Sequence, residues 1–199
     1  MDQTILIGLA GVLASAAPLV FAAVGETFAE RSGVINLSVN GTILLTAMAG
    51  FTVAVHTGSL FLGFLVGAVI GALVALIVAF ASITLKASQV AVGFVLTLLC
   101  RDLAYFLGNP VMGLSGPRLP SMPIPGLADI PVIGTLFFRQ DLIVYGSFLL
   151  IILSYIWVFR TRPGLVLQGI GERPAASFVR GANVNRQRYM YTLLGGALV

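Results

Sequence analysis

The sequence predicts an all-α fold, a polytopic bundle of transmembrane helices, from three observations. Of its 199 residues, 58% are hydrophobic and only 9% are charged, whereas roughly 25% of the residues of a soluble domain are charged. Apolar runs of the roughly 20 residues that a helix needs to cross a bilayer recur along the chain. These runs are apolar on all sides, which is typical of membrane helices and not of the alternating strands of a membrane barrel.

Each predicted span is one apolar run. The residues from Tyr191 to Val199 are too few to cross even a thin bilayer. We therefore expect residues 1–199 to form a single transmembrane domain that is incomplete at its C-terminal end, the N-terminal portion of a longer protein. Five complete spans are expected at residues 4–24, 37–55, 60–84, 90–107 and 142–159, with a sixth beginning near Tyr189.

Basic residues predict the orientation of the spans, because short loops rich in Lys and Arg stay on the cytoplasmic side. Residues 160–188, which we call the basic segment, are expected inside, and counting backwards places Lys86 and the turn at 26–31 inside as well. The N-terminus and the connection at 108–141 are then outside. The arginines of the basic segment are Arg160, Arg162, Arg173, Arg180, Arg186 and Arg188.

The extracytoplasmic loop at 108–141 is dense in proline and glycine, which excludes a long helix and favours a stiff, extended path. A short re-entrant or interfacial piece is expected around 130–138. Two interpretations stay open, a docking face for a partner and a rigid strap between two spans. The prolines are Pro110, Pro117, Pro120, Pro123, Pro125 and Pro131.

Residues for enzyme chemistry are not assembled anywhere in the sequence. His56 is the only histidine and Cys100 the only cysteine, so no metal cluster and no catalytic residues are predicted. Cys100 lies in an apolar run, where a small buried hydrophobic role is expected. A glycine-rich phosphate cradle of the Walker type is also missing, so if ATP drives this protein, another chain binds it.

Glycines recur at a spacing of four in the third span, at Gly63, Gly67 and Gly71. Small residues on one face allow membrane helices to approach closely. We predict that this face is a helix-packing surface.

Residues 25–41 separate the first two apolar runs with charge and glycine. Asn36, Ser38 and Asn40 are spaced two apart and do not share one helical face, which predicts a partly unwound entry to the second span. Broken backbone at membrane depth needs protein cover or a wet cavity. For Glu26, Glu30 and Arg31 themselves, the preferred interpretation is a simple cytoplasmic turn with a local ion pair.

The basic segment contains the signals of a short helix at 174–180. Pro174 suits a first helical turn, Ala175 and Ala176 are strong helix formers, and Gly181 is placed to end the helix in a left-handed conformation. Such a helix would present a small face to a soluble partner. It could instead lie on anionic lipid through the flanking arginines.

Two motifs resemble those of the permease subunit of bacterial ABC importers in the branched-chain amino acid and simple-sugar superfamily, especially its nucleoside and simple-sugar branch. The first is GE at 25–26, ERSGVIN at 30–36 and Gly41, and the second is RTRPGLVL at 160–167, GERPAA at 171–176 and Gly181. The connector PIPGLADIP at 123–131 is similar to the same branch. The sequence departs from the family at Asn40, where a glutamate is common, and at Arg173, where an asparagine would cap the next helix.

The resemblance implies a permease domain that binds no cofactor itself, while ATP is used by a cytoplasmic ABC ATPase. Further implied partners are a second permease subunit, identical or a paralogue, and an extracytoplasmic substrate-binding protein, in a bacterial inner membrane with the N-terminus outside and no nucleic acid involved. The polar side chains expected along the substrate pathway are Asn36, Asn40 and Gln89. The residues expected to couple to the ATPase are Gly171, Glu172, Arg173, Pro174, Ala175, Ala176 and Gly181.

The substrate class stays open, because a few amide and hydroxyl side chains suit nucleosides, sugars and amino acids alike. Nucleosides or simple sugars are preferred on the resemblance, with branched-chain amino acids as an alternative. A self-contained channel or ion-coupled carrier would require intramembrane carboxylates or inverted repeats, neither of which is clear in the sequence.

Overall fold

The computed structural model describes residues 3–199, with side chains from residue 5 onward. These residues are 77% helical and form no strand, apart from an isolated antiparallel bridge between Ser121 and Asp141. The all-α prediction is confirmed. The elements are α1 (Gln3–Arg31), α2 (Val39–Thr57), α3 (Leu60–Ala79), the π-helical turn η1 (Phe80–Thr84), α4 (Gln89–Gly108), the 3-10 turn η2 (Asn109–Val111), α5 (Ile133–Phe137), α6 (Leu142–Arg160), α7 (Arg162–Glu172), α8 (Pro174–Val179) and α9 (Val184–Leu198).

Five helical segments within the described chain are long and apolar enough to cross a membrane, which confirms the predicted number of complete spans. The third span runs without a break from α3 into η1. The segments are Ile5–Arg31, Val39–Thr57, Leu60–Thr84, Gln89–Val111 and Leu142–Arg160.

Two helix boundaries differ from the prediction by five residues or more. The first helix continues past Val24 to Arg31, because a change from apolar to charged residues marks the expected edge of the hydrocarbon and not the end of a helix. Ala, Glu and Arg are in fact good helix formers. The last helix begins at Val184 and not near Tyr189, since the Asn183 side chain caps it by accepting a hydrogen bond from the Arg186 N–H.

The chain divides into two compact units. The first comprises residues 3–21 of α1 together with Arg118–Leu153, which contains α5 and the first part of α6. Gln140 is buried there, and its amide donates to the carbonyls of Leu136 at 2.7 Å and Ala10 at 3.3 Å. The short helix α5 lies within the range 130–138, where a short re-entrant or interfacial piece was predicted. This part of the connection at 108–141 is therefore hydrogen-bonded to α1.

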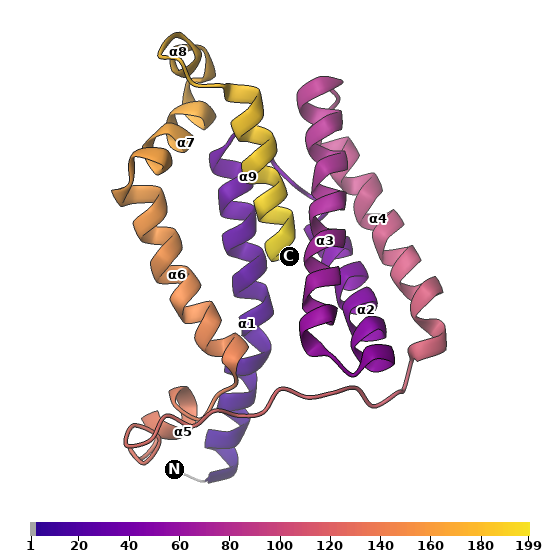
Figure 1. Cartoon of the computed structure of the whole chain (residues 1–199), viewed down its shortest axis with the longest axis vertical. Helices are drawn as coiled ribbons and strands as arrows, with labels where there is room; N and C mark the ends of the chain where they lie inside the picture. The colour runs from indigo at the N-terminus through magenta and orange to yellow at the C-terminus, as the bar shows by residue number, and fades with distance from the viewer. Residues whose placement is uncertain (1–2) are drawn as a thin grey trace. The chain divides into compact units, whose positions relative to one another are not determined.

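The second unit comprises Ala22–Pro117 and Ser154–Val199. Helices α2, α3 and α4 pack together, and α9 lies along α3 (Figure 1). Cys100 is buried in this unit's core, as predicted. The buried core residues are Val34, Val74, Val78, Leu96 and Cys100.

Glycines allow α9 to touch two helices at backbone distance. Gly195 contacts the backbone of Gly25 on α1, and Gly196 contacts Gly71 on α3 together with the Cβ of Ala75. A side chain at any of these glycines would overlap a carbonyl group. The predicted packing role of the glycine face of α3 is confirmed, because Gly63 likewise lies against Gly50 of α2.

Candidate functional site

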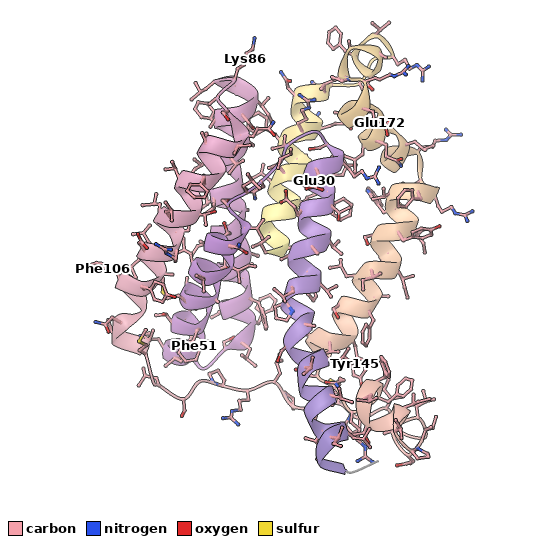
Figure 2. The ribbon with its side chains drawn as sticks, turned by 180° about the vertical axis from the view of Figure 1, so that it is seen from behind. Glu30, Phe51, Lys86, Phe106, Tyr145 and Glu172 are labelled. Atoms are coloured by element: carbon pink, nitrogen blue, oxygen red, sulfur yellow. The ribbon has the colours of Figure 1, made fainter. Side chains whose placement is uncertain are left out.

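Charged groups gather at one end of the second unit. Figure 2 shows Lys86 and Glu172 at that end, and Phe51 and Phe106 toward the opposite end. The predicted topology requires the turn after the first span, the start of the fourth span and the basic segment to share one side of the membrane. Hydrogen bonds among these three regions, given below, agree with that requirement.

The turn after α1 is the non-helical segment 32–38, which we call the elbow. Helix α1 ends because Gly33 adopts a left-handed conformation with φ of 89°. The N–H of Gly33 donates to the carbonyl of Glu30 at 2.9 Å, and the N–H of Val34 donates to that of Ala29 at 3.1 Å. This pair of bonds is a Schellman cap. Val34 and Ala29 are both buried.

Side chains of the elbow and of α1 satisfy the backbone groups that follow this cap. The Glu26 carboxylate accepts a hydrogen bond from the Asn36 N–H at 2.8 Å. The amide oxygen of Asn36 accepts from the N–H of Ser38 at 3.1 Å and from its hydroxyl at 2.6 Å. Asn36 and Ser38 are both buried. The partly unwound entry to the second span is confirmed, and α2 begins at Val39.

Helix α4 holds the elbow from another direction. The Gln89 amide accepts from the Ile35 N–H at 2.9 Å and donates to the Gly33 carbonyl at 3.4 Å. About two helical turns further along α4, the Thr97 hydroxyl donates to the Leu37 carbonyl at 2.7 Å. Non-helical backbone in a membrane protein needs such internal partners, because no water is available in the hydrocarbon.

The basic segment reaches the elbow at two points. The Arg188 Nε on α9 donates to the Ser32 carbonyl at 3.0 Å. At the end of α7, Gly171 packs against the Arg31 carbonyl so closely that a Cβ would overlap it, and that Cβ would lie 3.5 Å from the Gly33 nitrogen. The elbow is thus contacted by α1, α4, α7 and α9.

The three predicted pathway residues have different surroundings. Asn36 and Gln89 meet in the elbow, where their amides bond to backbone, whereas Asn40 is exposed in the first turn of α2. The predicted ion pair among Glu26, Glu30 and Arg31 is absent from the described chain. Glu26 instead accepts the Asn36 N–H, and the Arg31 guanidinium lies 5.6 Å from the centre of a ring on α6, that of Phe159. The Glu26 carboxylate already has a hydrogen-bond donor in the backbone N–H of Asn36, and it therefore does not require Arg31 as a partner.

Helix α7 was missed by the sequence interpretation, which expected one short helix in the basic segment. Thr161 caps it by accepting the Gly164 N–H at 3.2 Å, and Pro163 occupies its first turn. Leu167 and Ile170 are fully buried. Thr161 with Pro163 two residues later was a readable start signal, but glycine has a low helix propensity and this stretch contains several.

Helix α8 forms where it was predicted, from Pro174, and ends at Val179, two residues before Gly181, which has a φ of 87°. The N–H of Gly181 donates to the carbonyl of Phe178 at 2.9 Å, and the N–H of Ala182 donates to the carbonyl of Ser177 at 3.0 Å. Arg173 provides no side-chain cap, as expected. The coupling residues predicted around this helix, Glu172, Arg173, Ala175, Ala176 and Gly181, are exposed, while Gly171 and Pro174 are partly covered.

Two apolar side chains on α8 escaped the sequence interpretation. Phe178 is 71% exposed and Val179 is 85% exposed, and α8 has no buried residue. The signal available was an apolar pair inside a polar segment. An exposed apolar pair of this kind is a candidate for contact with a partner protein or a membrane surface.

These features define a multi-pass helical membrane protein with a polar elbow and a short exposed helix at one end. Residues 8–198 match the family described as branched-chain amino acid transport system, permease component, and the chain belongs to this family. The resemblance inferred from the motifs is therefore confirmed.

Relatives with assigned names match nearly the whole chain. A protein of Haloferax volcanii named as a glucose ABC transporter permease, TsgC13, is 37% identical and matches 92% of this chain and 56% of its own length. The nucleoside ABC transporter permease NupC of Lactococcus lactis and the guanosine ABC transporter permease NupQ of Bacillus subtilis are each 33% identical, matching 98% of this chain and 65% of their own lengths. The chain therefore spans 56% to 65% of the length of these relatives. No solved structure matches it.

Proposed function

We propose that this chain is a membrane-spanning permease subunit of an ABC importer that moves nucleosides or simple sugars inward. Alternating access would be driven by a separate ATPase. The match to the permease family over residues 8–198 is the observation that carries this proposal. The names of the relatives, two for nucleosides and one for glucose, favour these substrate classes.

The proposed coupling surface is α8 with its flanking residues. Its exposed apolar pair, Phe178 and Val179, lies beside Ala175 and Ala176 on a helix short enough to enter a groove. Burial of such side chains against a partner contributes roughly 25 cal/mol per Å² of apolar surface. The cytoplasmic ABC ATPase is the proposed partner, and ATP is used there and not by this chain.

The same proposal includes the assembly and its location. We place the chain in a bacterial inner membrane with the N-terminus outside, paired with a second permease subunit and served by an extracytoplasmic substrate-binding protein. The arginines of the basic segment support this orientation, because positive loops stay in the cytoplasm. Asn36, Asn40 and Gln89 remain the proposed polar side chains along the substrate pathway.

Transport by the reconstituted complex tests the function. The full-length protein, its ATPase and its binding protein are placed in proteoliposomes, and uptake of radiolabelled guanosine, glucose and leucine is measured with and without ATP. We expect guanosine or glucose uptake that requires ATP. Uptake of leucine alone would identify a branched-chain amino acid permease, and uptake without the ATPase would identify a channel or carrier; either result contradicts the proposal.

A variant pair tests the coupling surface. Val179→Asp places a charge in the exposed apolar pair and is expected to abolish stimulation of ATP hydrolysis by the loaded binding protein. Asn185→Asp adds the same charge to the same segment at an exposed position of α9 and serves as the matched control. Equal stimulation in the two variants, at equal membrane insertion, would exclude α8 as the coupling surface.

A further inference from the structure

We infer that Arg188 is a positioning residue, which transmits movement of the basic segment to the elbow and through it to the first turn of α2. This inference rests on the proposed function, because it assigns a role to contacts between the coupling surface and the pathway. Its starting point is the bond from the Arg188 Nε to the Ser32 carbonyl, 3.0 Å long.

The contact joins a charged donor to a buried backbone acceptor. Ser32 is fully buried, and Arg188 is partly buried. The guanidinium also covers Gly33, where a Cβ would lie 2.9 Å from the Arg188 Nη2. Hydrogen bonds to charged groups are roughly twice as strong as neutral ones. Displacing α9 without moving the elbow would leave a buried carbonyl without its donor, which is costly.

The helices before and after α8, which are α7 and α9, both contact the same short stretch of backbone at residues 31–33. Before α8, helix α7 ends with Gly171 against the Arg31 carbonyl. After α8, the chain turns at Gly181 and enters α9, whose second turn carries Arg188. A force applied to α8 therefore reaches residues 31–33 from two sides.

The far side of the elbow is bonded to the bundle. Gln89 holds the backbone at Gly33 and Ile35, and the Thr97 hydroxyl holds the Leu37 carbonyl. Within α2, Gly41 lies against the Thr97 carbonyl with no room for a side chain. A displacement at residues 32–33 thus reaches Gln89 and the entry of α2, where the proposed pathway residues lie.

A simpler role for Arg188 would be to cap α1, because basic side chains stabilise the carbonyl end of a helix. The two roles make different predictions. A cap affects the stability of the protein, while a positioning residue affects how much transport each ATP hydrolysis yields. The experiment must therefore measure uptake and hydrolysis separately.

The test uses Arg188→Met in the full-length complex in proteoliposomes, since methionine keeps an apolar stem but has no donor. We expect ATP hydrolysis to continue and substrate uptake per ATP to fall about tenfold, the factor that loss of one charge-assisted hydrogen bond corresponds to. Arg186→Met is the matched control. It removes the same charge from the same helix, at an exposed side chain roughly 200° around the axis from Arg188.

A second readout follows the elbow itself. In a Cys100→Ser background, Ile35→Cys places a label site on an elbow residue that is 45% exposed. We expect its maleimide reaction rate to change when the ATPase is trapped with nucleotide, and this change to be lost with Arg188→Met. If Arg188→Met does not assemble, Thr97→Val removes the hydroxyl that holds the Leu37 carbonyl on the far side of the elbow, and it is expected to lower uptake per ATP in the same way.

Unchanged uptake per ATP in Arg188→Met, or in Thr97→Val where that variant is used, would overturn the inference, even if thermal stability falls. So would loss of uptake per ATP in the Arg186 control to the same extent. Failure of the proposed function looks different, because the unmodified complex would then show no ATP-dependent uptake at all.

Discussion

Helices α7 and α8 follow one another in the same basic segment and differ in what covers them. In α7, Gly164, Leu167 and Ile170 are buried, and a side chain of the helix reaches back to α6, where the Gln168 amide donates to the Val158 carbonyl at 2.8 Å. Helix α8 has no buried residue and exposes Phe178. The basic segment thus combines a packed helix, α7, with an unpacked one, α8, so substitutions in the two helices should differ in kind.

The largest effect on stability is expected for a core residue of α7. Ile170→Ala should lower the free energy of unfolding by about 2–5 kcal/mol, because it removes buried methyl groups and leaves a cavity. Thermal unfolding of the purified protein in detergent measures this. Leu165→Ala, on the same helix but 62% exposed, is the control, and an equal loss in both variants would mean that α7 is not packed as described.

The close contact of α7 with the elbow comes next. Gly171→Ala should cost about 1–3 kcal/mol, since the added methyl group overlaps the Arg31 carbonyl and the backbone must shift. At Gly169 an added Cβ would meet only the Ser177 hydroxyl, at 3.1 Å, which can rotate away. Gly169→Ala should be neutral or stabilising by up to ~1 kcal/mol through helix propensity. Equal unfolding midpoints for Gly171→Ala and Gly169→Ala would contradict the close contact described at Gly171.

The cap of α7 gives a smaller effect. Thr161→Ala removes the hydroxyl that accepts the Gly164 N–H and should cost about 0.5–2 kcal/mol. Thr161→Ser keeps the hydroxyl and should retain most of the stability. Unfolding midpoints of the three proteins test this, and a serine variant as unstable as the alanine variant would argue that the methyl group, and not the cap, matters.

The smallest effect on stability is expected in helix α8. Val179→Ala should change the free energy of unfolding by less than ~0.5 kcal/mol, because the side chain is 85% exposed. Stimulation of the partner ATPase should nevertheless decrease, since the proposed contact area shrinks. A destabilisation as large as that of Ile170→Ala would show that α8 packs against the rest of the protein.

Local sequence preferences predicted helix α8 well and helix α7 poorly. Pro174 and Gly181 mark the bounds of α8 with backbone preferences that act within the residue itself. Helix α7 contains Gly164 and Gly171, whose low propensity argued for a loop. Both positions are glycine because carbonyl groups of neighbouring segments lie against them, which is a tertiary reason that propensity does not contain.

The elbow shows the same difference between features set by local sequence and features set by tertiary contacts. Its glycine and polar residues predicted an interruption before the second span, and α2 begins two residues later than expected. Which atoms fill the interruption could not be predicted, because the partners Gln89 and Arg188 are distant in sequence. The expected ion pair was wrong for the same reason: a carboxylate bonds to whichever donor the fold brings near it.

The amino-acid sequence alone determined the membrane class, the number of complete crossings, the family motifs and the bounds of α8. Each of these follows from hydropathy or from backbone preferences over a few residues. The extension of α1 to Arg31, the existence of α7 and the side chains that hold the elbow followed from the folded arrangement. They depend on close backbone contacts and on hydrogen bonds between segments up to 156 residues apart, and such pairings arise only once the helices have packed.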